Sequence, residues 1–351
     1  MQGTSPLTPV RDEAVLRMPG LETDNLLAQL ASWGLLRTLE HARPEWKPRL
    51  SWEGPPWCAR LHLAEQVDEI AVSEAANEGI LAIAGRFDTD SRRDVKFNRD
   101  VYAAYLEKIH GDEVAETFAS SLTAEHPVRN NGSLVPSPFV FMFGQGHQHF
   151  LERVVQVPLG VLPKRLQSKR TPPDLNDPVK IREALFVPWR REDETNAFRW
   201  DPVEDQRYAL RFDDPSRAGA AATVHGANRL AAVGFSCLAC APRRDVPGVP
   251  GVRRRRYSIE FVWPIWEPPL ALPGVLALLS HPAVIEGRLE DVRPLGVREI
   301  YRARRVSNGR YQSVTWAHPL ATDAKGASPS SRHGRSIRDE PIESEADALA
   351  E

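Results

Sequence analysis

The spacing of apolar positions predicts a buried helix near the start of the chain. In GLETDNLLAQLASWGLLRTLEH the leucines and Gly34 recur near helical spacing. Thr23 or Asp24 is a candidate N-cap, and Pro44 lies just beyond the last turn. We therefore expect this helix over about residues 25–41.

Short strands and further helices follow in the next part of the chain. Leu50 and Trp52, and then Leu61 and Leu63, alternate as strands do on either side of a proline turn. FNRDVYAAYLEKIHG and DEVAETFASSL read as helices, the first closed by Gly111. SPFVFMFGQGHQHFLERVVQ predicts an apolar strand, a glycine turn, and a helix from about residue 147.

The pattern in the second half of the chain predicts a strand with arginines along one face. In FRWDPVEDQRYALRF, residues 198–212, Tyr208 shares one face with two apolar residues, while Arg207 and Arg211 lie on the other. Pro202 marks an entry turn before this strand. GANRLAAVGFSCLAC predicts a helix of small residues, and RRRRYSIEFVWPIW a strand that follows four arginines. VREIYRARRVSNGRYQSVTWAH predicts a hairpin around an Asn-Gly turn.

These elements predict an α+β protein. We expect a largely helical N-terminal domain with short strands over residues 1–165, and a boundary in the proline-rich loop at 166–178. A mixed domain with an antiparallel, arginine-lined sheet follows over 179–319. Residues 320–351 have few apolar positions and are expected to form a disordered acidic tail. The 30 prolines among 351 residues favour many loops over a helical bundle.

Charge is segregated along the chain, although the formal net charge is only −2. Residues 243–310 hold thirteen basic against seven acidic side chains, whereas the chain from residue 318 holds four against seven. This asymmetry favours a polyanionic partner, with a solvated arginine-rich face as the alternative. No apolar run is long enough to span a membrane. The odd number of three cysteines argues for a reducing cytoplasm.

Three groups of side chains are candidates for catalysis or metal binding, and each has a simpler interpretation. His147 and His149 would share a face only on extended backbone, and they diverge if a helix begins there. Cys237 and Cys240 have the spacing of half a zinc site, but small residues on an apolar helix explain them as well. The third group is an acidic loop interleaved with arginines, formed by Asp88, Asp90 and Asp94. We therefore predict no catalytic residues, no metal and no cofactor.

Binding of nucleic acid is better supported by the sequence. Arginine forks donate two parallel hydrogen bonds to phosphate and keep their charge. Nearby Tyr301, Tyr311 and Trp316 could stack on bases or pack in the core. If the strands share a sheet, the arginines would form one basic surface, and the predicted nucleic-acid-binding residues are Arg207, Arg211, Arg229, Arg253, Arg254, Arg255, Arg256, Arg302, Arg304 and Arg305.

Three motifs in the same order resemble a protein family encoded beside type I-G (formerly I-U) CRISPR–Cas systems. They are GLETDNLLAQLASWGLLRTLE, FRWDPVEDQRYALRFDDPS followed by GANRLA, and LGVREIYRARRVSNG. The resemblance covers about residues 20–310. The positions that match the middle motif are Trp200, Asp201, Pro202, Asp205, Arg207, Tyr208, Gly226, Asn228 and Arg229.

This resemblance implies a large-subunit-like or accessory component of a CRISPR surveillance complex in antiviral defence. The expected partners are CRISPR RNA or target DNA and the other subunits of the complex. Asp201 and Asp205 would then hold Arg207 or Arg229 by charge-assisted hydrogen bonds. The alternatives are a scaffold that touches only protein, and a metal-dependent nuclease that uses His147 and His149.

Overall fold

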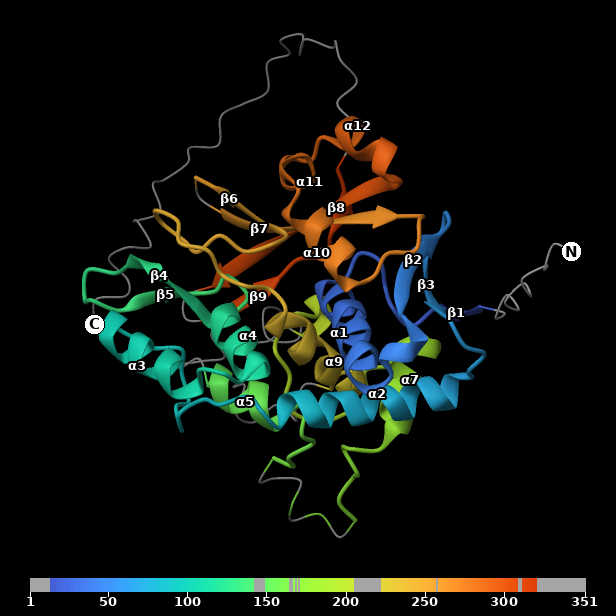
Figure 1. Ribbon diagram of the computed structural model, residues 1–351, viewed down its shortest axis with the longest axis horizontal. Helices are drawn as coiled ribbons and strands as arrows, with labels where there is room; N and C mark the ends of the chain where they lie inside the picture. Colours follow the sequence, from blue (N-terminus) through green and yellow to red (C-terminus); the bar gives the residue numbers. More distant parts are fainter. Residues whose placement is uncertain are drawn as a thin grey trace, which may run out of the picture. The chain divides into compact units, whose positions relative to one another are not determined.

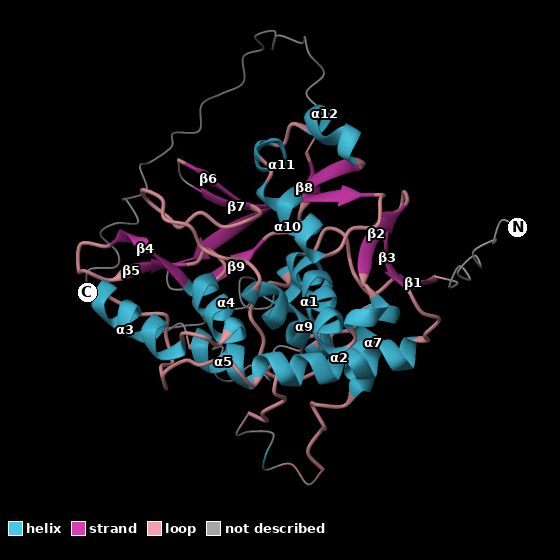
Figure 2. Ribbon diagram, in the orientation of Figure 1, coloured by secondary structure: helices cyan, strands magenta, loops and turns pink. Residues whose placement is uncertain are grey.

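The protein combines helices with antiparallel sheets, which confirms the α+β class (Figures 1 and 2). The computed structural model describes residues 13–320 apart from 142–148, 164–166, 168, 170, 205–221, 257 and 309–310. The helices in this part of the chain are α1 (Leu26–Ala42), α2 (Glu69–Ala84), α3 (Arg99–Ile109), α4 (Glu113–Leu122), α5 (Phe150–Gln156), α7 (Pro178–Phe186), α9 (His225–Ser236), α10 (Leu272–Ser280), α11 (Pro282–Glu286) and α12 (Leu289–Val292), with short 3-10 turns at Pro44–Trp46 and Arg293–Leu295.

Helix α1 begins where the sequence predicts, and it is buried on almost every side. The side chain of Asn25 caps it by accepting a hydrogen bond from the Leu27 backbone N–H at 3.0 Å. Helix α9 crosses α1 at its centre, where Gly34 faces Leu230 and Gly234 faces Leu30. Because neither glycine has a Cβ, the two backbones approach closely enough to touch.

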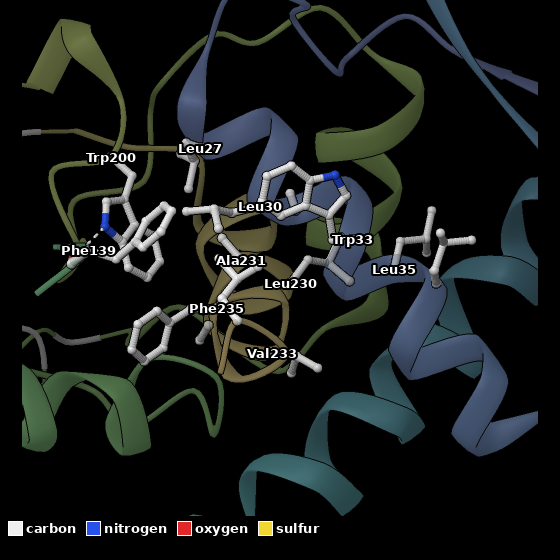
Figure 3. Close-up of a cluster of buried hydrophobic side chains, with 14 of the residues drawn as sticks. Leu27, Leu30, Trp33, Leu35, Phe139, Trp200, Leu230, Ala231, Val233 and Phe235 are labelled. Carbon is white, nitrogen blue, oxygen red and sulfur yellow. Dashed lines mark hydrogen bonds between the residues drawn. The ribbon is translucent and has the colours of Figure 1, made fainter. Parts of the chain in front are cut away.

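Aromatic side chains pack around this helix crossing (Figure 3). Trp200 is fully buried, stacks on Phe198 at 4.4 Å, and donates its indole N–H to the Phe139 carbonyl at 3.0 Å. Its own carbonyl accepts a hydrogen bond from the Leu27 backbone at the start of α1. Trp200 is therefore part of the core and contacts both helices, through the Leu27 backbone of α1 and the Phe235 ring of α9.

One strand before α1 and two strands after it form a three-stranded antiparallel sheet. Its order is β1-β3-β2, with β1 (Ala14–Met18), β2 (Arg49–Glu53) and β3 (Cys58–Leu63). The alternation of Leu61 and Leu63 with exposed residues predicted β3 correctly. A separate two-stranded ladder joins β4 (Thr123–Val128) and β5 (Leu134–Pro136).

The larger antiparallel sheet is built from the late, arginine-rich part of the chain. Its order is β10-β8-β7-β6, and β9 also pairs with β8. The strands are β6 (Val252–Arg255), β7 (Ser258–Trp266), β8 (Val297–Asn308), β9 (Tyr311–Val314) and β10 (His318–Pro319). Pairing of Asn308 with Tyr311 confirms the predicted hairpin, although Asn308, predicted in the turn, is the last residue of β8. Helices α10 to α12 pack beside this sheet (Figure 1).

The structure corrects three local predictions. Residues 137–141 form turns and irregular backbone instead of a strand, although Phe139 and Phe141 are buried as predicted. The next described helix, α5, begins at Phe150. The arginines of RRRR precede strand β7 as predicted, but the first three also belong to a strand that was not predicted, β6. The strand predicted at residues 207–212 lies outside the described residues.

The segments predicted as two domains share one buried core. Helix α1 from the first segment packs along α9 from the second, and the hydrophobic cluster contains side chains of both. The residues up to Leu320 form one compact unit, and the predicted tail lies beyond the described residues.

Candidate nucleic-acid interface

Four arginines surround one glutamate on a single face of the large sheet. The strand register places Arg253 of β6 and Arg304 of β8 directly opposite Glu260 of the central strand β7. Because side chains alternate between faces, Arg255 and Arg302 lie on the same side, two residues further along. We call Arg253, Arg255, Arg302 and Arg304 with Glu260 the arginine face.

Glu260 forms ion pairs with all four guanidinium groups, at distances too long for hydrogen bonds. Its carboxylate oxygens lie 3.8 Å from Arg253, 4.0 Å from Arg255, 3.6 Å from Arg302 and 3.7 Å from Arg304. The Glu260 side chain is only 3% exposed, and its Oε2 has no hydrogen-bond partner in the described part of the chain. One buried carboxylate therefore balances a quarter of the positive charge around it.

Three of the four arginines face solvent. The side chains of Arg255, Arg302 and Arg304 are 51%, 32% and 58% exposed, and their guanidinium N–H groups donate no hydrogen bond to any described residue. Arg253 is nearly buried, and also contacts Glu286 of α11 at 3.3 Å. The exposed guanidinium groups can therefore donate to an incoming phosphate without breaking a hydrogen bond to a described residue.

Other predicted arginines of the described strands do not join this face. Arg305 lies on the opposite side of β8, where it donates to the Pro138 carbonyl at 3.3 Å and sits over the Phe141 ring. Arg254 alternates to that side as well, and Arg256 follows the end of β6. A strand separates neighbouring side chains onto two faces, so consecutive arginines cannot form one surface.

Arg229 lies apart from the sheet and is fully buried in α9, which corrects its prediction as a surface arginine. Its Nε donates to the Pro158 carbonyl at 2.9 Å. Arg207, Arg211, Asp205 and Tyr208 fall in the segment 205–221, outside the described residues.

Asp201 does not pair with Arg229, one of its two predicted partners, and the other, Arg207, lies outside the described residues. Asp201 is fully buried and accepts a hydrogen bond from Arg191 at 2.7 Å and another from Asn25 at 3.1 Å. Arg191 also reaches Glu22 at 2.7 Å. Sequence reasoning missed Arg191, because nothing local signals that a loop arginine will meet a carboxylate ahead of α1.

The other matched motif residues make packing contacts. Gly226 lies so close to α7 that a Cβ there would be 2.0 Å from the Lys180 carbonyl oxygen. Asn228 accepts from the Phe198 backbone at 3.3 Å and donates to the Thr223 hydroxyl at 2.8 Å. Both residues therefore position α9 against its neighbours.

One of the aromatic residues predicted as stacking platforms, Tyr301, is separate from the arginine face. It alternates to the opposite side of β8 and stacks on Trp263 at 6.4 Å, nearly parallel. The Tyr311 side chain lies outside the described part of the structure, and Trp316 is half-buried beyond β9. Tyr301 therefore cannot stack on a base held by these arginines.

The residues of the candidate metal sites make other contacts wherever the structure describes them. Asp88 and Asp90 pair with Lys108 at 2.9 and 3.1 Å. Burial raises the pKa of Cys237 to about 11 and that of Cys240 to about 12, so both thiols stay protonated at neutral pH. No group of three His, Cys, Asp or Glu side chains among the described residues could hold a metal ion.

His149 precedes α5, with its Nδ1 at 3.8 Å from the Glu152 carboxylate. Its predicted partner His147 lies outside the described residues. No helix in the described part of the chain combines the length and apolarity that a membrane span requires. Comparison of the chain with protein-family models, with curated proteins and with solved structures finds no match.

Glu204, which lies within the middle motif, makes the stability of the protein depend on pH. Burial, and then the charge of Asp201, raise its pKa from 4.5 to about 8. The folded protein therefore keeps a proton that the unfolded chain releases above about pH 4.5. This contribution to stability is complete at acid pH and is lost as the pH rises towards 8.

We expect Glu204→Gln to flatten this dependence, because a neutral amide mimics the protonated acid. The variant should exceed the wild type in free energy of unfolding by about 1 kcal/mol or more near pH 8, but not near pH 5. Urea unfolding at both pH values measures the difference. The exposed Glu290→Gln is the control, and identical pH profiles for wild type and Glu204→Gln would refute the assignment.

Proposed function

We propose that the protein is a non-catalytic subunit or accessory component of a type I CRISPR effector complex, and that it binds nucleic acid through the arginine face. The observation that carries the binding proposal is the convergence of four arginines on one buried glutamate, with three partly exposed guanidinium groups that donate no hydrogen bond to a described residue. The CRISPR proposal rests on the three motifs that resemble the type I-G family and follow one another in the same order.

The chemistry of the arginine face favours recognition of the phosphate backbone. Arg302 and Arg304 are two residues apart on one strand, so their Cα atoms are about 6.6 Å apart along the sheet. Arg255 extends the row across β7 from the other side. Arginine contacts to phosphate oxygens fix the position of a nucleic acid but do not read its bases. We therefore expect binding that depends little on base sequence.

Replacing Arg255 and Arg304 together by glutamine is expected to weaken nucleic-acid binding by tenfold or more. Each guanidinium that neutralises a phosphate releases counterions, so the slope of log K against log salt should become shallower by about 0.7 to 0.9 per arginine removed. Both quantities come from titrating the full chain against fluorescent RNA and DNA oligonucleotides at several salt concentrations.

The matched control is Arg288→Gln with Arg293→Gln, which removes the same charge from side chains paired with Asp291 and Glu290. This variant should keep the wild-type affinity and slope. The interface assignment fails if the arginine-face variant binds like the wild type, or if the control loses as much affinity.

A scaffold that touches only protein is the second candidate, and one contact favours it. Glu286 shows that a carboxylate from a neighbouring element can pair with an arginine of this face. Acidic side chains of another subunit could occupy the exposed guanidinium groups in the same way.

Co-purification separates the two candidates. The chain is expressed with its genomic neighbours and a guide array, then recovered at moderate salt. A stoichiometric complex that contains guide RNA, and loses it in the Arg255/Arg304 variant, is the expected result. If the complex assembles but this chain does not crosslink to the RNA, the result would favour the scaffold. Recovery of the chain as a lone monomer would refute both candidates.

A further inference from the structure

Two buried polar side chains on one face of α9 have atoms without hydrogen-bond partners. Arg229 uses its Nε on the Pro158 carbonyl, but its Nη1 and Nη2 contact no acceptor. His225 lies one turn earlier, with its Nε2 at 3.0 Å from the Leu175 carbonyl and its Nδ1 unpartnered. Both residues are fully buried, and positions four apart share a helix face.

A third unpartnered atom comes from the chain that faces this helix. Asn176 donates its amide to the Leu159 carbonyl at 3.1 Å, and its buried Oδ1 has no partner. Leu159 follows the residue that Arg229 contacts, and Leu175 precedes Asn176. These hydrogen bonds link α9 to the segment that follows α5 and to the segment that precedes α7, and they tie those two segments to each other. We call Arg229, His225 and Asn176 the Arg229 cluster.

The charge at the Arg229 cluster is unbalanced. Burial lowers the pKa of Arg229 to about 10, so the guanidinium remains cationic at neutral pH. No carboxylate of a described residue lies within ion-pair distance of it; Asp174 acts on it only from further away. A buried cation is strongly unfavourable unless an anion accompanies it.

The same cluster also needs a hydrogen-bond donor. Burial, and then the charge of Arg229, lower the pKa of His225 to about 4, so its ring is neutral at neutral pH. The ring gives its one proton, on Nε2, to the Leu175 carbonyl, which leaves Nδ1 as an acceptor. The Oδ1 of Asn176 is an acceptor as well. Water supplies donors but no negative charge, and chloride supplies charge but no donor.

We propose that the Arg229 cluster binds one hydrogenphosphate group. Its ionised oxygens would accept from Nη1 and Nη2 of Arg229, the bidentate geometry that suits this side chain. Its protonated oxygen donates to Nδ1 of His225 or Oδ1 of Asn176. Because His225 and Arg229 are fully buried, free inorganic phosphate is favoured over a phosphate ester, whose chain would need a path to the solvent. This proposal is independent of the arginine face.

Thermal unfolding of the full chain in phosphate and in sulfate tests the proposal. At matched ionic strength, phosphate should raise the unfolding midpoint by a few degrees with saturation, since it binds only the folded state. Sulfate should do much less, because it carries no proton to donate at neutral pH. Glucose 6-phosphate, an ester, should have no effect if free phosphate is the ligand, and an equal effect would identify an ester site instead.

Variants assign the effect to the cluster. Arg229→Gln should lose the phosphate-dependent rise, whereas Arg302→Gln with Arg304→Gln should retain it, which separates this site from the arginine face. Equilibrium dialysis of the wild type with radiolabelled phosphate should give one site per chain. The proposal is overturned if the wild type binds no phosphate, or if a folded Arg229→Gln variant keeps the full response.

Discussion

Replacing Gly34 by alanine is expected to destabilise the protein by about 4 kcal/mol or more, the largest effect of any single substitution considered. A Cβ at Gly34 would lie 1.8 Å from the Leu230 carbonyl oxygen of α9. The obstacle is backbone of a buried helix, so no side chain can rotate away. The helices can accept the methyl group only by separating, which opens voids around Trp33 and Phe235.

Gly234→Ala should give a similar loss, because its Cβ would lie 2.0 Å from the Leu30 carbonyl oxygen on the other side of the crossing. Gly274→Ala in α10 is the matched control, since the nearest atom to its Cβ would be 3.5 Å away. That substitution should be neutral or stabilising by up to about 1 kcal/mol, through helix propensity. Urea unfolding followed by circular dichroism compares the three, and a Gly34→Ala protein as stable as the control would rule out this close crossing.

Replacing Arg191 by methionine is expected to cost about 3 to 5 kcal/mol of stability. Arg191 bridges the fully buried Asp201 and the half-buried Glu22, both at 2.7 Å. Methionine keeps much of the side-chain volume, but it leaves Asp201 with Asn25 as its only described side-chain donor. Without its cation, a buried carboxylate loses the attraction that offsets most of the free-energy cost of its desolvation.

Adding Asp201→Asn to Arg191→Met tests whether charge is the cause. The double variant should recover part of the lost stability, because no unpaired charge then remains in the core. Arg288→Met breaks an exposed ion pair with Asp291 and should change the free energy of unfolding by less than about 0.5 kcal/mol. Additive losses from Arg191→Met and Asp201→Asn would show that the two side chains do not depend on one another.

Local patterns were enough to predict many elements of the fold. Leucine spacing located α1 to within a residue or two, although its N-cap is Asn25 and not the predicted Thr23 or Asp24, and alternation located β3. Helices α3 and α4 were also predicted, and each starts at an Asn or Asp cap. Helix α2 was missed, although Asp68 caps it in the same way, by accepting from the Ala71 backbone at 2.8 Å.

The arginine face was predicted only in part. The arginines themselves and their place on neighbouring strands could be read from the chain, but not which of them share a face with Glu260. That depends on the register between β6, β7 and β8, in which a shift of one residue moves every side chain to the other face. Arg305, predicted in the same group as Arg304, therefore ends against Phe141.

The sequence alone determined what neighbouring residues decide among themselves: helix starts at caps, alternation along strands, and the hairpin between β8 and β9. Only the tertiary structure decided which distant segments meet. Burial of Arg229, the pairing of Arg191 with Asp201, and the contact between Gly34 and α9 each require two segments far apart in the chain to approach. The physical reason is that packing and desolvation act between side chains that are close in space, whatever their separation in sequence.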